Sequence, residues 1–192
     1  MSQKANEILD FWFGSRDEPD YGKPKKVWFA KEPEFDEEIR RRFLTDYEKA
    51  AAGNLDEWKD SPDNCLALIL LLDQFPRNIF RENPQAFATD WEALSTAHQA
   101  IAQGFDRKLL NVQRWFVYLP FVHSENIEHQ RQAVKLFQKL SGDRDSASAI
   151  ENAIRHRSVI ERFGRFPHRN LILGRPSNPE EKEFLKQPGA RF

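Results

Sequence analysis

Apolar residues recur along most of this chain with the spacing of an α-helix. Phe35, Ile39, Phe43 and Tyr47 follow one another every four residues, which predicts an amphipathic helix that frays at 53–54. The stretch 65–72 is apolar on every side, so we expect it to be the central buried helix. No stretch has a convincing strand alternation, and the chain is therefore predicted to be all-α.

Further helices follow from the same spacing and from capping signals. Asn83 is a predicted N-cap with Pro84 at the first helical position, and Asn178 with Glu181 has the pattern of a capping box. Pro120 is expected to stop the aromatic helix that precedes it. The expected helices cover 8–13, 35–53, 61–72, 84–104, 115–119, 124–140, 146–163 and a short segment from 178, all in a single domain, 1–192.

One sequence motif occurs twice. Phe75-Pro76-Arg77-Asn78 and Phe166-Pro167-His168-Arg169-Asn170 each follow a helical stretch, and each precedes an Asn-Pro pair that opens another helix. A proline that ends a helix would hold the basic and amide side chains at the break. The spacing suggests duplicated helical units, as in α-solenoids, while the alternative is a chance repeat in an aromatic-rich helical protein.

Composition excludes several classes of protein. A net charge of -1 gives no global electrostatic reason to expect a nucleic-acid partner, although the segment 155–175 holds six arginines and a single acid. The one cysteine, Cys65, excludes an internal disulfide. The N-terminus lacks a signal-peptide core, and the longest apolar run is too short to span a bilayer, so we expect a cytoplasmic protein without a membrane partner.

Several charged residues fall at positions that suit a core better. Asp73 ends the most apolar helix, where the helix dipole disfavours an anion, so it needs a cationic partner such as Arg77, Arg81 or Arg157. Arg157 lies seven residues after Ile150, in the middle of the predicted apolar stripe of its helix. A buried guanidinium must be paired or must line a cavity, because an isolated buried charge costs several kcal/mol.

These observations favour one polar pocket built at the helix ends. Arginine and histidine side chains suit a carboxylate or phosphate, because a guanidinium offers two parallel donors. The leading hypothesis is a module that binds a small anion, or the acidic or C-terminal end of a peptide. The expected lining is Asp73, Arg77, Asn78, His123, Glu125, His129, Arg157, Arg165, His168, Arg169 and Asn170; four of the arginines (77, 157, 165 and 169) would hold the anion, the asparagines would fix the loops, and Asp73 would orient an arginine.

Two other functions fit the same residues. An enzyme could use His123 or His129 with Glu125 as an acid–base pair, since Glu125 and His129 are one helical turn apart and can touch. The polar residues could instead form a purely structural salt-bridge network in a scaffold that binds proteins by its outer surface.

Other motifs point to packing and surface roles. His123, Glu125 and His129 do not have the spacing of a metalloprotease site, so we expect neither a metal nor a cofactor. Cys65 is expected to be inert packing, and His98 a hydrogen-bonded core histidine on the apolar face of the helix 84–104. No glycine-rich phosphate loop is present in the sequence.

The motifs together resemble a known bacterial family. Asp73-Gln74-Phe75-Pro76-Arg77-Asn78, Leu119-Pro120-Phe121-Val122-His123-Ser124-Glu125 and the stretch 163–170 are similar to hallmarks of "domain of unknown function 924", and the resemblance covers nearly the whole chain. It implies a single all-helical domain, similar in shape to the tetratricopeptide-like α–α superhelices, although the tetratricopeptide consensus at a period of about 34 residues is absent. The resemblance implies no particular activity.

Overall fold

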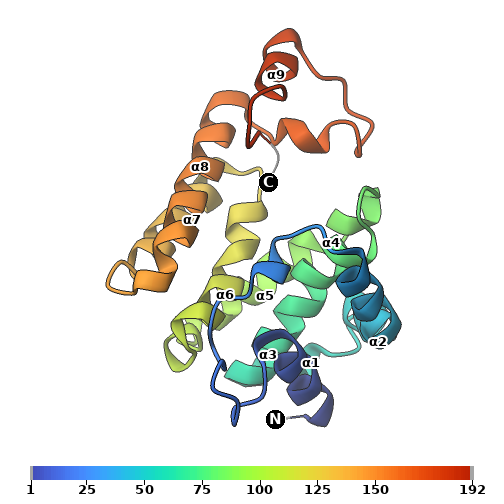
Figure 1. The fold of residues 1–192 in the computed structure, drawn as a ribbon, viewed down its shortest axis with the longest axis vertical. Coiled ribbons are helices and arrows are strands. Elements are labelled where there is room, and N and C mark those ends of the chain that lie inside the picture. Colours follow the sequence, from blue (N-terminus) through green and yellow to red (C-terminus); the bar gives the residue numbers. More distant parts are fainter. Residues whose placement is uncertain (1, 191–192) are drawn as a thin grey trace.

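The computed structural model describes residues 2–190, in which helices are joined by turns and loops and no strand occurs (Figure 1). This confirms the all-α prediction, whereas the tetratricopeptide-like superhelix stays a prediction. The helices are α1 Gln3–Phe13, α2 Pro33–Ala51, α3 Pro62–Ile69, α4 Phe75–Ile79, α5 Asp90–Ala102, α6 Asn111–His123, α7 Ile127–Gln138, α8 Ala147–Phe163 and α9 Pro179–Phe184. A π turn, η3 Leu70–Gln74, joins α3 to α4, and the 3₁₀ turns are η1 Lys26–Trp28, η2 Asp56–Asp60, η4 Pro84–Phe87, η5 Asp106–Lys108, η6 Arg144–Ser146 and η7 Pro167–Arg169.

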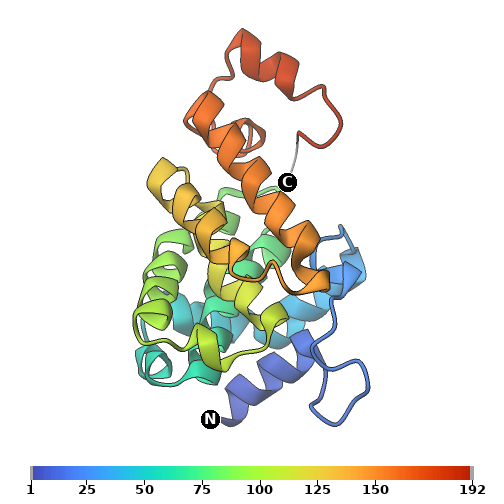
Figure 2. The same cartoon turned by 90° about the vertical axis from the view of Figure 1, so that its left-hand side faces the viewer.

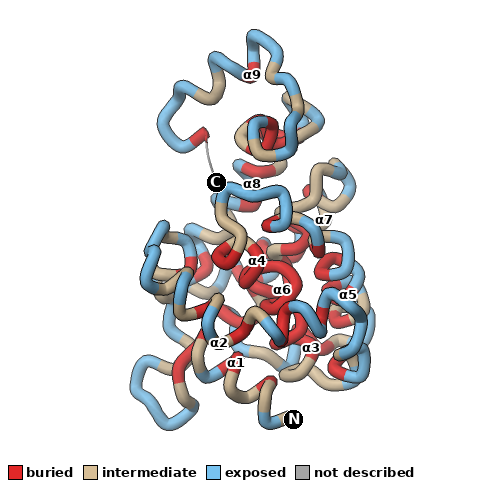
Figure 3. Tube along the Cα trace, turned by 90° about the vertical axis from the view of Figure 1, so that its right-hand side faces the viewer, coloured by how far each residue is buried: buried red, intermediate tan, exposed pale blue. Residues whose placement is uncertain are grey.

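The main apolar core forms around α3 and α6. Every residue of 65–74 is buried, as the uniformly apolar sequence of 65–72 predicts, and the buried residues gather around α3, α4 and α6 in Figure 3. Side chains from α1, α2, α5, α7 and α8 complete this core. Large rings dominate it: Trp12 lies against the rings of Trp28, Phe75 and Phe116.

The helix that contains Pro76 does not end at the proline, and the prediction of a break there is wrong. In a regular α-helix the carbonyl of Leu72 would accept from the N–H at position 76, which proline lacks. The chain widens into the π turn, in which the Phe75 N–H donates to Leu70 O, five residues back. The hydroxyl of Thr89 donates to Leu72 O at 2.6 Å, so the carbonyl that the proline orphans is satisfied and the helix continues.

Pro120 also lies inside a helix, because α6 runs on to His123. The expected stop at Pro120 is therefore wrong. A proline in a helix interior costs about 3 kcal/mol, but most residues of α6 are buried, and tertiary packing of that kind outweighs local propensity. The continuation through residues 120–123 places His123 at the end of α6, where it reaches Asp73 of the π turn.

The apolar face predicted for 84–104 differs from the observed one. The segment divides into η4 and α5, and α5 buries the small residues Ala93, Ala97 and Ala100, which allow it to pack closely against α3. The larger residues Trp91 and His98 are exposed, so the prediction of a core histidine at 98 is wrong.

The chain after α8 forms a second, smaller packed unit. Helix α8 ends at Gly164, which adopts a left-handed conformation, and the second Phe-Pro motif then forms η7. Val159, Ile160 and Phe166 form the apolar centre of this unit, which extends beyond the main body in Figures 1 and 2. The two copies of the motif thus differ in backbone, since Pro76 lies within a helix and Pro167 begins a 3₁₀ turn.

Among residues 2–190, no helix combines the length and the apolar character that crossing a membrane requires.

Replacing Thr89 by valine should destabilise the fold. The substitution removes the donor to Leu72 O and leaves a buried carbonyl unsatisfied, which costs about 1–3 kcal/mol. Thr96→Val is the matched control, because Thr96 is also buried but its hydroxyl donates to Glu92 O, four residues back within regular helix. Urea denaturation of both variants should give the larger loss for Thr89→Val; equal losses would contradict the role of the hydroxyl at the π turn.

Candidate functional site

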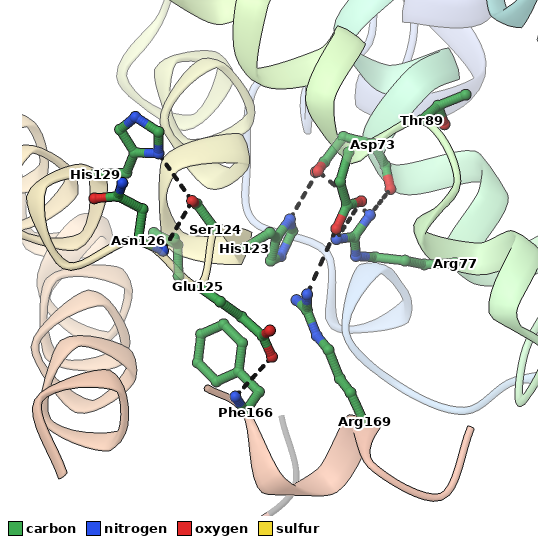
Figure 4. Close-up of polar contacts among 12 residues, drawn as sticks. Asp73, Arg77, Thr89, His123, Ser124, Glu125, Asn126, His129, Phe166 and Arg169 are labelled. Atoms are coloured by element: carbon green, nitrogen blue, oxygen red, sulfur yellow. Dashed lines mark hydrogen bonds and ion pairs between the residues drawn. The ribbon is translucent and has the colours of Figure 1, made fainter. Parts of the chain in front are cut away.

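A buried carboxylate at the π turn organises the polar residues. Asp73 is fully buried, and its Oδ1 accepts from Nδ1 of His123 at 2.7 Å while Oδ2 accepts from the amide of Gln74 at 2.6 Å (Figure 4). Arg77, one turn further along, lies 3.3 Å from Asp73 Oδ1 and donates to the Asp73 backbone carbonyl. Arg77 is one of the three cationic partners that the sequence suggests for Asp73; Arg81 instead binds Asp36.

Asp90, at the start of α5, connects two arginines from distant parts of the chain. Its Oδ1 lies 2.9 Å from Arg77 Nη2, and its Oδ2 lies 3.5 Å from Arg169 Nη1. The guanidinium of Arg169 also lies over the rings of Phe87 and Phe166, each at 4.7 Å. Asp90 therefore joins the helices of the main core, through Arg77, to η7 of the second unit, through Arg169.

Glu125 provides a second connection between the two units. Both of its oxygens accept from Arg175, at 2.7 and 2.9 Å, and Oε1 also accepts from the Phe166 N–H at 2.8 Å. Figure 4 shows Glu125 and Arg169 on the same side of His123, opposite Asp73. We refer to the set Asp73, Arg77, Asp90, His123, Glu125, His168, Arg169 and Arg175 as the polar cluster.

The charges of the polar cluster balance. It contains three carboxylates and three guanidinium groups, and both of its histidines have a lowered pKa. Burial would raise the pKa of Asp73, but Arg77 and His123 bring it down to about 2. Burial, followed by the nearby Arg77, lowers the pKa of His123. Burial and Arg169 lower the pKa of His168 to about 3.

Arg169 differs from the other arginines in its surroundings. Only 8% of its side chain is exposed, and burial together with the nearby Arg77 lowers the pKa of Arg169 to about 10. The Nε of Arg169 is buried and has no hydrogen-bond partner among the described residues. Arg77 Nη2 and Asp90 Oδ1 are also buried without a hydrogen bond within residues 2–190, although they form an ion pair with each other at 2.9 Å. Buried polar atoms without partners are rare in proteins and need an explanation.

Several predicted site residues lie outside the polar cluster. Asn78 donates to Asp36 on α2, at 2.7 Å. Arg165 binds Glu181 through two hydrogen bonds and so fixes the second unit internally. Asn170 donates to Ser177 and accepts from Arg175, and its loop-fixing role stays a prediction.

The predicted contact between Glu125 and His129 does not form. Glu125 precedes α7 rather than lying on it, so helical spacing does not apply, and the carboxylate binds Arg175 instead. Nδ1 of His129 lies 2.9 Å from the hydroxyl of Ser124, and its ring is 5.6 Å from that of His98.

Arg157 is also misplaced by the sequence argument. The buried face of α8 consists of Ala153, His156, Val159 and Ile160, so the polar residue on that face is His156 rather than its neighbour. Arg157 is partly exposed and lies 3.4 Å from Glu161. The prediction centred the buried face on Ile150 and Ile154, which lie at its edge, and so placed Arg157 rather than His156 on that face.

Sequence reasoning missed three residues at or beside the polar cluster: Asp90, His156 and Arg175. The sequence signal for Asp90 was weak, since an acid in the first turn of a helix is ordinary. Arg175 lies at the end of the arginine-rich segment 155–175, but its partner Glu125 is 50 residues away in the sequence.

The two best-formed hollows of the surface lie over α1 and α2 and include no residue of the polar cluster. Within residues 2–190, no group of three or more His, Cys, Asp or Glu side chains has an arrangement that could hold a metal ion.

Comparison with known proteins places the chain in a family. The family model described as "Bacterial protein of unknown function (DUF924)" matches residues 8–189. The chain belongs to this family. The chain is similar to a solved structure, that of a protein of unknown function from Agrobacterium tumefaciens, at 42% sequence identity; the match covers 95% of this chain and 97% of that one, with a TM-score of 0.86. No curated protein matches the chain.

The buried histidine of α8 should make the stability of this DUF924 protein depend on pH. Burial lowers the pKa of His156 to about 3, against about 6.5 in an unfolded chain. Stability should therefore be full above pH 6.5 and should fall as the pH decreases toward 3, because the unfolded chain binds a proton that the folded one does not. The slope from His156 alone is about 1.4 kcal/mol per pH unit.

Urea denaturation between pH 7.5 and 4.5 measures this dependence. The pH dependence of His156→Gln should be flatter than that of the parent by about one proton's contribution. An unchanged slope in His156→Gln would contradict the assignment.

Proposed function

We propose that this protein binds a small oxyanion at Arg169. The supporting observation is that the Arg169 guanidinium is buried but incompletely paired. Its ion-pair partner Asp90 is 3.5 Å away, and its Nε makes no hydrogen bond with the described residues. Hydrogen bonds from arginine to a carboxylate or phosphate are charge-assisted and geometrically matched. An oxyanion that accepts from Nε would remove the cost of this unsatisfied donor.

The other arginines of the second unit provide the contrast. Arg165 and Arg175 each bind one carboxylate through two hydrogen bonds, in both cases at 2.6–2.9 Å. Such bidentate pairs need no further ligand: the Arg165 pair fixes the second unit internally, and the Arg175 pair attaches it to Glu125 of the body. Arg169 is stacked on Phe87 and Phe166 but lacks a bidentate partner, which favours it over Arg165 and Arg175 as the contact to a ligand.

A second candidate function is acid–base catalysis by His123. The hydrogen bond of 2.7 Å between Asp73 and His123 favours it, because a carboxylate at Nδ1 fixes the tautomer of an imidazole and stabilises its protonated form. The partner expected from the sequence, Glu125, is bound to Arg175 instead. A scaffold with a purely structural network is the alternative to both functions.

Sulfate should stabilise the protein through Arg169. We expect sodium sulfate, at constant ionic strength with sodium chloride, to raise the Tm progressively and to give a saturable heat in calorimetry. Arg169→Lys keeps the charge but loses the guanidinium fork, so sulfate affinity should fall on the order of tenfold. Small carboxylates tested in the same way show whether planar anions bind as well.

Arg165→Lys is the matched control, since this arginine lies four residues away and already has a bidentate carboxylate partner. It should leave sulfate affinity unchanged even if it lowers the Tm. Stabilisation by sulfate that is no greater than that by chloride, or that is equal in the parent and Arg169→Lys, would favour the structural network.

A further inference from the structure

His123 has one ring nitrogen committed and one available. Nδ1 is hydrogen-bonded to Asp73, and no hydrogen bond from the described chain reaches Nε2. The side chain is 14% exposed. With the Nδ1 proton directed at the carboxylate, Nε2 presents a lone pair that can accept a proton.

Charged or titratable groups from several elements surround His123. Some of these groups contact one another in series. Asp73 contacts both His123 and Arg77, and Asp90 contacts both Arg77 and Arg169. The groups that face His123 are Asp73 and Arg77 from the π turn and α4, Asp90 from α5, Glu125 from the segment after α6, His156 from α8, and His168 and Arg169 from η7.

An anion that enters this balanced set of charges would leave it with an excess negative charge. A buried charge without compensation is costly, and a nearby group that can take up a proton lowers that cost. His156 and His168 are poor acceptors because burial holds them far from protonation at neutral pH. His123 has the closest carboxylate, Asp73, to stabilise an added positive charge.

We propose that the oxyanion binds together with one proton, which His123 accepts at Nε2 and then donates in a hydrogen bond to the ligand. The proton comes from the solvent and stays on the imidazole, so no covalent bond of the ligand is formed or broken. This inference rests on the proposed function at Arg169 and assigns His123 as the second contact of the same ligand.

The arrangement of donors favours a tetrahedral oxyanion of the sulfate or phosphate type. Arg169 belongs to η7 and His123 to α6, so the two donors come from separate elements of the fold. A tetrahedral group can accept from donors placed around it in three dimensions, whereas the acceptors of a carboxylate lie in one plane.

Isothermal calorimetry with sulfate tests the proton directly, because sulfate does not titrate between pH 6 and 8. Measurements at pH 7 in two buffers of different ionisation enthalpy should show uptake of close to one proton per sulfate bound. The dissociation constant should rise roughly tenfold per pH unit above the pKa of His123, as linkage to one proton requires. Sulfate binding without proton uptake would overturn this inference and leave the oxyanion site at Arg169 intact.

His123→Gln separates the hydrogen bond from the proton. Glutamine can still donate to the ligand but cannot be protonated, so the variant should bind sulfate more weakly, with no proton uptake and no pH dependence; His129→Gln should behave as the parent. Proton uptake that persists in His123→Gln would refute the assignment.

If this variant does not fold, NMR titration of the parent should show the pKa of His123 rising when sulfate is added, and an unchanged pKa refutes the proposal. Failure of the parent to bind sulfate at all overturns both proposals.

Discussion

The burial of one carboxylate, that of Asp73, determines how the polar part of this protein is built. A carboxylate removed from water is stable only when donors surround it, and here the donors come from His123, Arg77 and Gln74. His123 belongs to α6, so the contact joins the end of α6 to the π turn between α3 and α4. Loss of one partner would leave a buried charge, which makes these contacts depend on each other.

The π turn is what allows Asp73 to occupy this position. Pro76 prevents a regular helical bond to Leu72, and the widened turn that results leaves the Asp73 carbonyl to the Arg77 side chain. The backbone irregularity and the polar residues therefore have a common origin in one proline. Single-turn π segments of this kind are frequent at functional sites, which agrees with a ligand role for the residues that surround it.

The sequence predicts the helices well where packing is local and poorly where a partner is distant. Phe35, Ile39, Phe43 and Tyr47 are spaced every four residues, and this spacing identifies α2 because the apolar residues of an amphipathic helix mark its buried face. The continuation of the chain through Pro76 could not be read in this way, since the hydroxyl that permits it belongs to Thr89. Local propensity correctly marks the proline as unfavourable, and a tertiary hydrogen bond outweighs it.

The candidate site is predictable to a similar degree. Asp73, Arg77 and Arg169 could be singled out, because charged residues at the ends of apolar helices and in repeated motifs are conspicuous. Asp90, which connects the two arginines, has no such signal. The assignment of Arg157 fails by a single position, because its neighbour His156 faces the core and a phase error of about 100° moves a residue from the core to the surface.

Burial alone does not distinguish a structural arginine from one that could bind a ligand. The distinction also depends on whether the guanidinium donors already have hydrogen-bond partners within the protein. Arg175 and Arg165 hold the second unit with complete bidentate pairs, so their charges are accounted for by folding. Arg169 is the more deeply buried yet the less completely paired, and an apolar residue stacked between Phe87 and Phe166 would avoid the cost of its unsatisfied donor. A guanidinium at this position is therefore poorly explained by stability, and the oxyanion that we propose would supply the interaction that the fold itself does not provide.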